Sequence, residues 1–154
     1  MTVVPNISRY ISIYRALPGR EQIVLLGSLA LLPVFWLGLR LAGLQRFQGW
    51  LDRLPVARRE PLSHAEAAAL GVAVNRAANH VFGLATCLTR SLLLRWLLRR
   101  YGTASDLRIG VRFEGGELRA HAWVELGGIP VNDRPEVVAQ YAAFDQHLAP
   151  ERFS

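Results

Sequence analysis

The chain has 154 residues, a formal net charge of +6 and a single cysteine, and 51% of its residues are hydrophobic. This length suits one domain with a buried core, and a single cysteine excludes both an intrachain disulfide and a multi-cysteine metal site. All 18 basic residues are arginines, scattered without a zinc-finger, RNA-binding or phosphate-loop pattern, so we expect no nucleic acid partner, no metal, no cofactor and a reducing, cytoplasmic location.

An uncharged apolar run occupies residues 22–39. Its length reaches the lower edge of a bilayer-spanning helix, which needs about 17–25 residues. We expect one or two apolar helices over residues 20–53, with a kink at Pro33. Residues 22–44 either pack against protein, in the core or at a partner, or contact a membrane, and arginines on both sides leave the orientation in a membrane open.

A stretch rich in proline and charge follows at residues 54–62 and predicts a linker. It divides the chain into an apolar helical segment, residues 1–53, and a second domain, residues 54–154. Directly after the linker, Ser63 and Glu66 form a capping box that starts an alanine-rich helix.

The only cysteine, Cys87, follows Thr86, a typical N-cap residue, and precedes leucines at helical spacing. It therefore lies in the first turn of a helix, where unpaired N–H groups and the positive end of the helix dipole favour the thiolate and can bind an oxyanion. Leu88 and Arg90 follow in the same turn and are candidates for binding substrate or oxyanion, although Arg90 fits a solvated position equally well. A lone cysteine is by default a small buried hydrophobe, so the reactive interpretation depends on later residues.

Alternating apolar and polar residues predict two strands, over 107–113 and 118–126, joined by a turn that contains two glycines. The second strand places His121 and Trp123 on the same face. A strand histidine by itself indicates a polar network, and it becomes a catalytic candidate beside a nucleophile. Trp123 either shields the site from water, lines a substrate groove or belongs to the core.

The register of a third strand, over 129–133, decides whether a carboxylate reaches the histidine. A two-residue loop would set Asp133 opposite Ala122, on the face away from His121. A three-residue loop starting at Leu126, or an equivalent bulge, would set Asp133 opposite His121, and we predict this odd-numbered register.

With that register, Cys87, His121 and Asp133 would form a catalytic triad. Asp133 would orient the imidazole, whose other nitrogen would hold the Cys87 thiolate and later protonate the leaving amine. Asn132 is the alternative orienting residue and a further candidate for binding substrate.

The order of these elements predicts an α+β fold of the transglutaminase-like or papain-like cysteine-protease kind, in which N-terminal helices precede a small antiparallel sheet. After the third strand, the tail predicts a short helix from Pro135 and a last strand over 141–144. His147 is expected to be exposed.

The sequence resembles the lasso peptide biosynthesis B proteins, specifically the peptidase half of the split form, a branch of the transglutaminase-like superfamily. The resemblance covers residues 60–145, and it rests on four short motifs. These are C-L-T-R-S-L at 87–92, G-V at 110–111, A-H-A-W-V-E at 120–125 and V-N-D at 131–133.

This resemblance implies a cysteine peptidase that removes the leader peptide from a ribosomally made precursor, so that a cyclase can close the lasso ring. Cys87, His121 and Asp133 fall on the family's triad positions. A separate PqqD-like leader-recognition protein is also implied, because the first 60 residues lack the strand pattern of such a domain. Contact with the lasso cyclase is a further expectation.

Two alternatives remain at this point. One is another transglutaminase-like thiol amidase or acyltransferase, because a triad determines the acyl-enzyme step and not the acceptor. The other is a non-catalytic, membrane-associated scaffold with the same fold.

Overall fold

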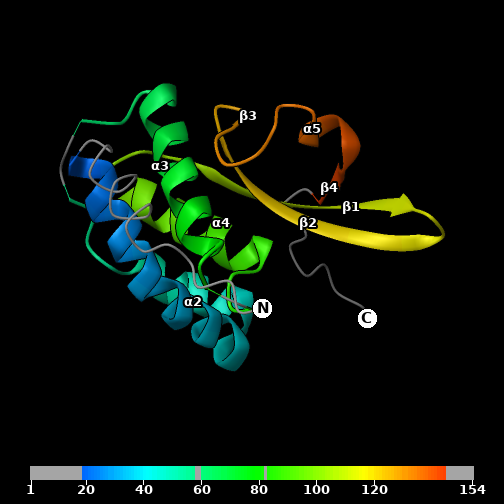
Figure 1. Ribbon diagram of the computed structural model, residues 1–154, viewed down its shortest axis with the longest axis horizontal. Helices are drawn as coiled ribbons and strands as arrows, with labels where there is room; N and C mark the ends of the chain where they lie inside the picture. Colours follow the sequence, from blue (N-terminus) through cyan, green and yellow to red (C-terminus); the bar gives the residue numbers. More distant parts are fainter. Residues whose placement is uncertain (1–18, 58–59, 82, 145–154) are drawn as a thin grey trace, which may run out of the picture.

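The structure, a computed structural model, describes residues 19–57, 60–81 and 83–144, so that His147 lies outside the described residues. Helices precede a small antiparallel sheet, which confirms the predicted α+β fold (Figure 1). The elements are α2 (Gly19–Asp52), α3 (His64–Ala78), α4 (Cys87–Arg100), β1 (Asp106–Glu114), β2 (Glu117–Leu126), β3 (Ile129–Pro130), α5 (Val137–Gln140) and β4 (Ala142–Ala143). In Figure 1, α2, α3 and α4 gather at one end of the molecule, and the β1–β2 hairpin extends away from them.

The long helix α2 covers the apolar run, as the sequence predicts. Its backbone leaves helical geometry at Gly43, with φ 74° and ψ 168°, rather than at Pro33, which lies inside the helix. Glycine adopts a positive φ without steric cost, and the non-helical backbone at Gly43 bends the chain there. Beyond the bend, Phe47 packs back over Gly38, and its ring centre lies 5.3 Å from that of Phe35.

Both α3 and α4 begin at the predicted caps. The Ser63 hydroxyl accepts the Glu66 N–H at 3.3 Å, and the Glu66 carboxylate accepts the Ser63 N–H at 2.8 Å, which completes the capping box. At α4 the Thr86 hydroxyl accepts the Thr89 N–H at 3.2 Å. Cys87 is therefore the first residue of a capped helix.

One hydrophobic core joins the three long helices to the base of the sheet. It includes Leu32 and Phe35 of α2, Leu92 of α4 and Val124 of β2, all of which are buried. The helix α2 thus shares its core with the second domain, and the boundary near residue 53 stays a prediction.

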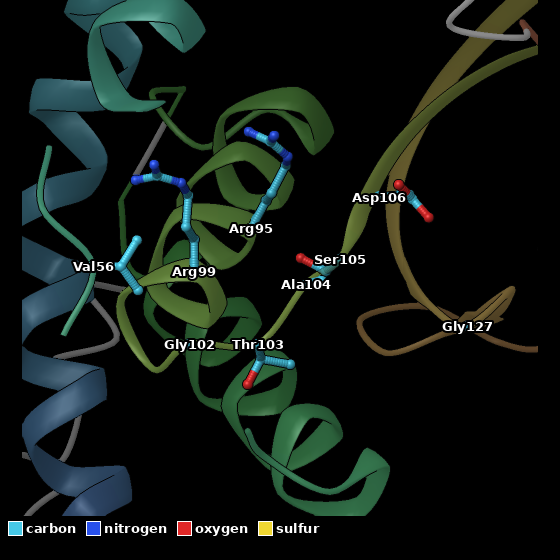
Figure 2. A pocket seen from close by; sticks show the side chains of 9 residues that line it. All are labelled: Val56, Arg95, Arg99, Gly102, Thr103, Ala104, Ser105, Asp106 and Gly127. Atoms are coloured by element: carbon cyan, nitrogen blue, oxygen red, sulfur yellow. The ribbon is translucent and has the colours of Figure 1, made fainter. Parts of the chain in front are cut away.

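Arginines in the C-terminal half of α4 bind the end of α2 and the residues just after it. Arg95 forms an ion pair with Asp52 at 3.3 Å, and Arg99 donates to the Leu54 carbonyl at 2.9 Å. These arginines line a pocket of about 480 Å³, shown in Figure 2. Arg99 lies about 18 Å along the helix from Cys87, at 1.5 Å per residue, so this pocket is not the predicted site.

The sheet has the strand order β3-β2-β1-β4 and positions the predicted site on β2. β1 and β2 pair along their full length, with Gly110 opposite His121. In the short strand β3, Ile129 pairs with Leu126, so the intervening loop consists of two glycines, with φ values of 59° and 82°. The predicted three-residue loop is therefore wrong, because two successive glycines adopt the left-handed conformations that a two-residue type I′ turn needs.

Candidate active site

A network of hydrogen bonds holds together the start of α4, the strand β2 and the segment after β3. Ser91, one turn beyond Cys87, donates its hydroxyl to the Ala122 carbonyl at 3.0 Å. Asn132 donates its side-chain amide to the Ser91 hydroxyl at 2.9 Å and accepts the Val124 N–H at 2.8 Å. Because Ala122 and Asn132 are direct neighbours of the two predicted triad partners, this network brings the predicted triad segments together.

His121 and Asp133 are in direct contact. Nε2 of His121 lies 2.5 Å from Oδ2 of Asp133, and the two side chains are 18% and 25% exposed. The Val131 N–H donates to the Val124 carbonyl at 3.0 Å, after which the chain bends. This bend, and not a longer loop, brings Asp133 to His121. The predicted contact between the two side chains is therefore confirmed.

Asn132 serves the fold and does not orient the imidazole. Its side-chain amide both donates and accepts within the network above, and its main-chain carbonyl accepts the Asn75 amide at 2.9 Å. This geometry corrects the interpretation of Asn132 as an alternative to Asp133. Asn132 also lines an open pocket together with Asp133, so its role in binding substrate stays a prediction.

Two aromatic rings pack beside the imidazole. The ring centres of Tyr141 and Trp123 lie 5.1 Å and 6.1 Å from that of His121. Trp123 is fully buried and donates its indole N–H to Glu125 at 2.8 Å, and Glu125 in turn accepts Arg108 at 3.0 Å. Trp123 is therefore a core residue that supports the imidazole, which corrects its predicted role in lining a substrate groove.

Gly110 and Tyr141 also belong to the site, although neither is among the residues predicted to form it. A Cβ at Gly110 would lie 3.0 Å from the Trp123 ring and 2.9 Å from the Tyr141 Cβ, so only glycine leaves room for this stack. A glycine within an alternating strand is a signal of close approach and could have marked Gly110. Tyr141 has no such signal, because it arrives through the pairing of β4 with β1, two segments distant in sequence.

Cys87 is half-buried at the start of α4. The Thr86 hydroxyl and carbonyl accept the third and fourth N–H groups of the helix, which leaves the N–H groups of Cys87 and Leu88 without an acceptor among the described residues. These two donors suit an oxyanion. The Leu88 side chain packs against the core, so only its backbone is available for this role.

The nitrogen of His121 that remains for Cys87 is Nδ1, because Nε2 contacts Asp133. Within the described residues, no hydrogen bond joins the Cys87 sulfur to this ring. Catalytic hydrogen bonds in free enzymes are often long and tighten when substrate binds. The catalytic roles of the three residues therefore stay a prediction.

Arg90 lines an open pocket of about 440 Å³ beside Asp133, together with Arg134. It is half-buried and makes no ion pair with any described residue. Asn75 lines the same pocket, and its buried Oδ1 has no hydrogen-bond donor in this part of the chain. The pocket thus places the positive charges of Arg90 and Arg134 beside the carboxylate of Asp133. Nowhere in the described ranges do three His, Cys, Asp or Glu side chains gather as a metal site.

Comparison with known families agrees with this arrangement. The model of the transglutaminase-like superfamily matches residues 29–144, a range that includes α3, α4, the sheet and much of α2. No curated protein and no solved structure matches the chain. Because the family match covers well over half of the sequence, the chain belongs to the transglutaminase-like superfamily.

Proposed function

We propose that this protein is a cysteine peptidase that removes the leader peptide from a ribosomally synthesised lasso peptide precursor. Membership of a superfamily that includes cysteine peptidases and acyltransferases supports the reaction type. The sequence likeness at 87–92, 120–125 and 131–133 supports the substrate. The observation that carries the proposal is the 2.5 Å contact between His121 Nε2 and Asp133 Oδ2.

In the first half of the proposed reaction, Asp133 holds the ring so that Nδ1 faces Cys87. His121 takes the thiol proton, and the sulfur attacks the carbonyl carbon of the scissile bond. The N–H groups of Cys87 and Leu88 stabilise the oxygen that becomes negative. The tetrahedral intermediate then expels the amine of the core peptide, which receives the proton from His121, and the leader remains as a thioester on Cys87.

Water completes the cycle. His121 takes a proton from the water molecule as its oxygen attacks the thioester carbonyl. The second tetrahedral intermediate breaks its carbon–sulfur bond, releases the leader carboxylic acid and returns the proton to Cys87. Neither half of this proposed reaction uses a cofactor.

A separate PqqD-like protein presents the leader in this proposal, which the resemblance to the split form of the lasso peptide B proteins at 87–92 and 120–125 supports. Arg90 and its pocket are proposed to bind the precursor, since a guanidinium pairs well with a carboxylate. The lasso cyclase is a further proposed partner, because it consumes the released core peptide.

The direct test is cleavage of a lasso precursor by the purified chain in the presence of its recognition partner, followed by mass spectrometry. Cys87→Ala should abolish cleavage and retain partner binding. His64→Ala, which changes an exposed residue at the start of α3, is the control and should retain both. Cleavage by Cys87→Ala at the wild-type rate would rule out the thiol mechanism.

The same assay separates a peptidase from an acyltransferase. Water as the acceptor leaves a leader carboxylate, whereas an amine acceptor leaves an amide of different mass. If no precursor is cut but a hydroxylamine-sensitive adduct forms on Cys87, the enzyme uses another acyl substrate. The lack of both products would favour a non-catalytic scaffold.

A further inference from the structure

The solvent side of α2 carries an apolar stripe. Its large members are 48–78% exposed, and consecutive members are three or four residues apart, which places them on one face of the helix. We define the stripe as Ile23, Leu26, Ala30, Val34, Leu37 and Leu41. The outer face of a helix that packs on a globular domain is normally polar. The stripe itself contains no charged or polar side chain, so it lacks the composition of a water-facing surface.

The opposite side of the same helix is packed against the domain. Val24, Leu32 and Phe35 are at most 5% exposed and lie in the core shared with α3 and α4. Figure 1 shows α2 along the outer side of the helical layer. The stripe therefore runs parallel to the surface of the domain for about 27 Å, at 1.5 Å per residue from 23 to 41.

The apolar surface continues past the bend at Gly43. An open groove of about 380 Å³ lies between the two parts of α2, and Leu37, Leu41 and Trp50 contribute to its walls. Trp50 is 54% exposed. An exposed tryptophan beside an apolar surface is typical of a membrane–water boundary.

The charges near the stripe are positive. Residues 1–51 contain five arginines and only one acidic residue, Glu21. Arg40 and Arg46 are exposed on α2, and the Arg40 guanidinium lies 5.4 Å from the centre of the Trp36 ring. Asp52, at the end of the helix, is already paired with Arg95 at 3.3 Å. A basic surface beside an apolar one is complementary to anionic lipid headgroups.

By length and composition α2 could also cross a bilayer, since Glu21–Asp52 reaches a mean hydropathy of 2.0. A crossing helix, however, would need to expose its inner face to lipid and leave the core that it shares with α3 and α4. A helix that lies in the plane of the membrane surface can keep its inner face packed on the domain while its outer apolar face contacts lipid.

We propose that α2 binds the surface of an anionic membrane, with the stripe buried at the boundary of headgroups and acyl chains, and with Arg40 and Arg46 at the headgroups. This attachment is independent of the proposed peptidase reaction. It would hold the candidate active site at the membrane surface without requiring lipid for catalysis.

The test is co-sedimentation of the full chain with vesicles of equal parts phosphatidylglycerol and phosphatidylcholine, compared with phosphatidylcholine alone. The double variant Leu37→Glu/Leu41→Glu should weaken binding to the anionic vesicles by about tenfold or more, because charged residues on this face oppose insertion. The matched control is Phe113→Glu/Leu118→Glu, at two residues that are 75% and 65% exposed on the β1–β2 hairpin. It should bind as the wild type does.

The outcomes separate the proposal from its competitors. Wild-type binding that falls with added salt and with the stripe variant supports it. Failure of the wild type to bind either vesicle overturns it, and a stripe-dependent dimer in light scattering would then identify a protein as the occupant. Equal binding by both double variants also overturns it. Circular dichroism checks that each variant is folded, and precursor cleavage without vesicles shows separately whether the peptidase proposal holds.

Discussion

Two buried serines provide a controlled test of the network that assembles the candidate site. Ser91 and Ser28 are 0% and 1% exposed, and both lie in helices. Ser91 bonds to the Ala122 carbonyl at 3.0 Å and to the Asn132 amide at 2.9 Å, whereas the Ser28 hydroxyl has no partner among the described residues. The same substitution by alanine should therefore have opposite consequences at the two positions.

The size of each change in the free energy of unfolding follows from the polar groups that lose their hydrogen-bond partner. Ser91→Ala leaves a buried carbonyl and a half-buried amide without their partner, and each such group costs up to about 1–3 kcal/mol. We expect the free energy of unfolding to fall by about 2–4 kcal/mol, a large share of the ~5–15 kcal/mol typical of a domain. Ser28→Ala removes a buried hydroxyl that has no compensating bond, so we expect no loss and a gain of up to about 1 kcal/mol.

Urea unfolding followed by circular dichroism measures both changes, through the midpoint at constant m value. Ser91→Ala should also slow precursor cleavage, because the Asn132 amide helps to hold the segment that carries Asp133. Equal stability of the two variants would refute the reasoning, since it would mean that the Ser91 hydrogen bonds contribute nothing to the native state.

Three further changes test individual parts of the site. Gly110→Ala should lower the free energy of unfolding in urea by about 1–3 kcal/mol, because the added Cβ meets the aromatic stack. Gly27→Ala, whose Cβ meets nothing within 4 Å, should not lower it, and similar losses in both variants would disprove the steric argument. Asp133→Asn should lower the kcat of precursor cleavage by about a hundredfold or more while the protein stays folded, and an unchanged kcat would remove Asp133 from the triad. Arg90→Glu should change stability by less than about 0.5 kcal/mol, since Arg90 has no ion pair among the described residues, and should raise KM for the precursor; an unchanged KM would exclude its pocket from binding.

Local signals in the sequence were sufficient for the start of α4 and for the two long strands. Thr86 bonds to a backbone N–H only two residues beyond Cys87, so the helix start depends on neighbours in sequence. Strand alternation likewise places His121 and Trp123 on one face without reference to the rest of the chain. Family resemblance added the expectation that Asp133 itself reaches the histidine, because it falls on a triad position of the family.

The route by which Asp133 reaches the histidine depends on long-range contacts. The glycine pair before β3 selects a two-residue turn, and by strand register alone this would point Asp133 away from His121. The bend that reverses this outcome is held by Asn132 through its bond to Ser91, which is 41 residues away in sequence. No local pattern encodes such a contact, and the same holds for the packing of Tyr141 on the imidazole.

The central claim is that His121, held by Asp133, acts on the sulfur of Cys87. The most direct measurement is the rate at which iodoacetamide alkylates this single thiol at neutral pH, because the reaction needs no precursor and no partner. The account predicts that His121→Ala slows alkylation by about tenfold or more, whereas His64→Ala leaves the rate unchanged. Equal rates in the wild type and in both histidine variants would contradict it.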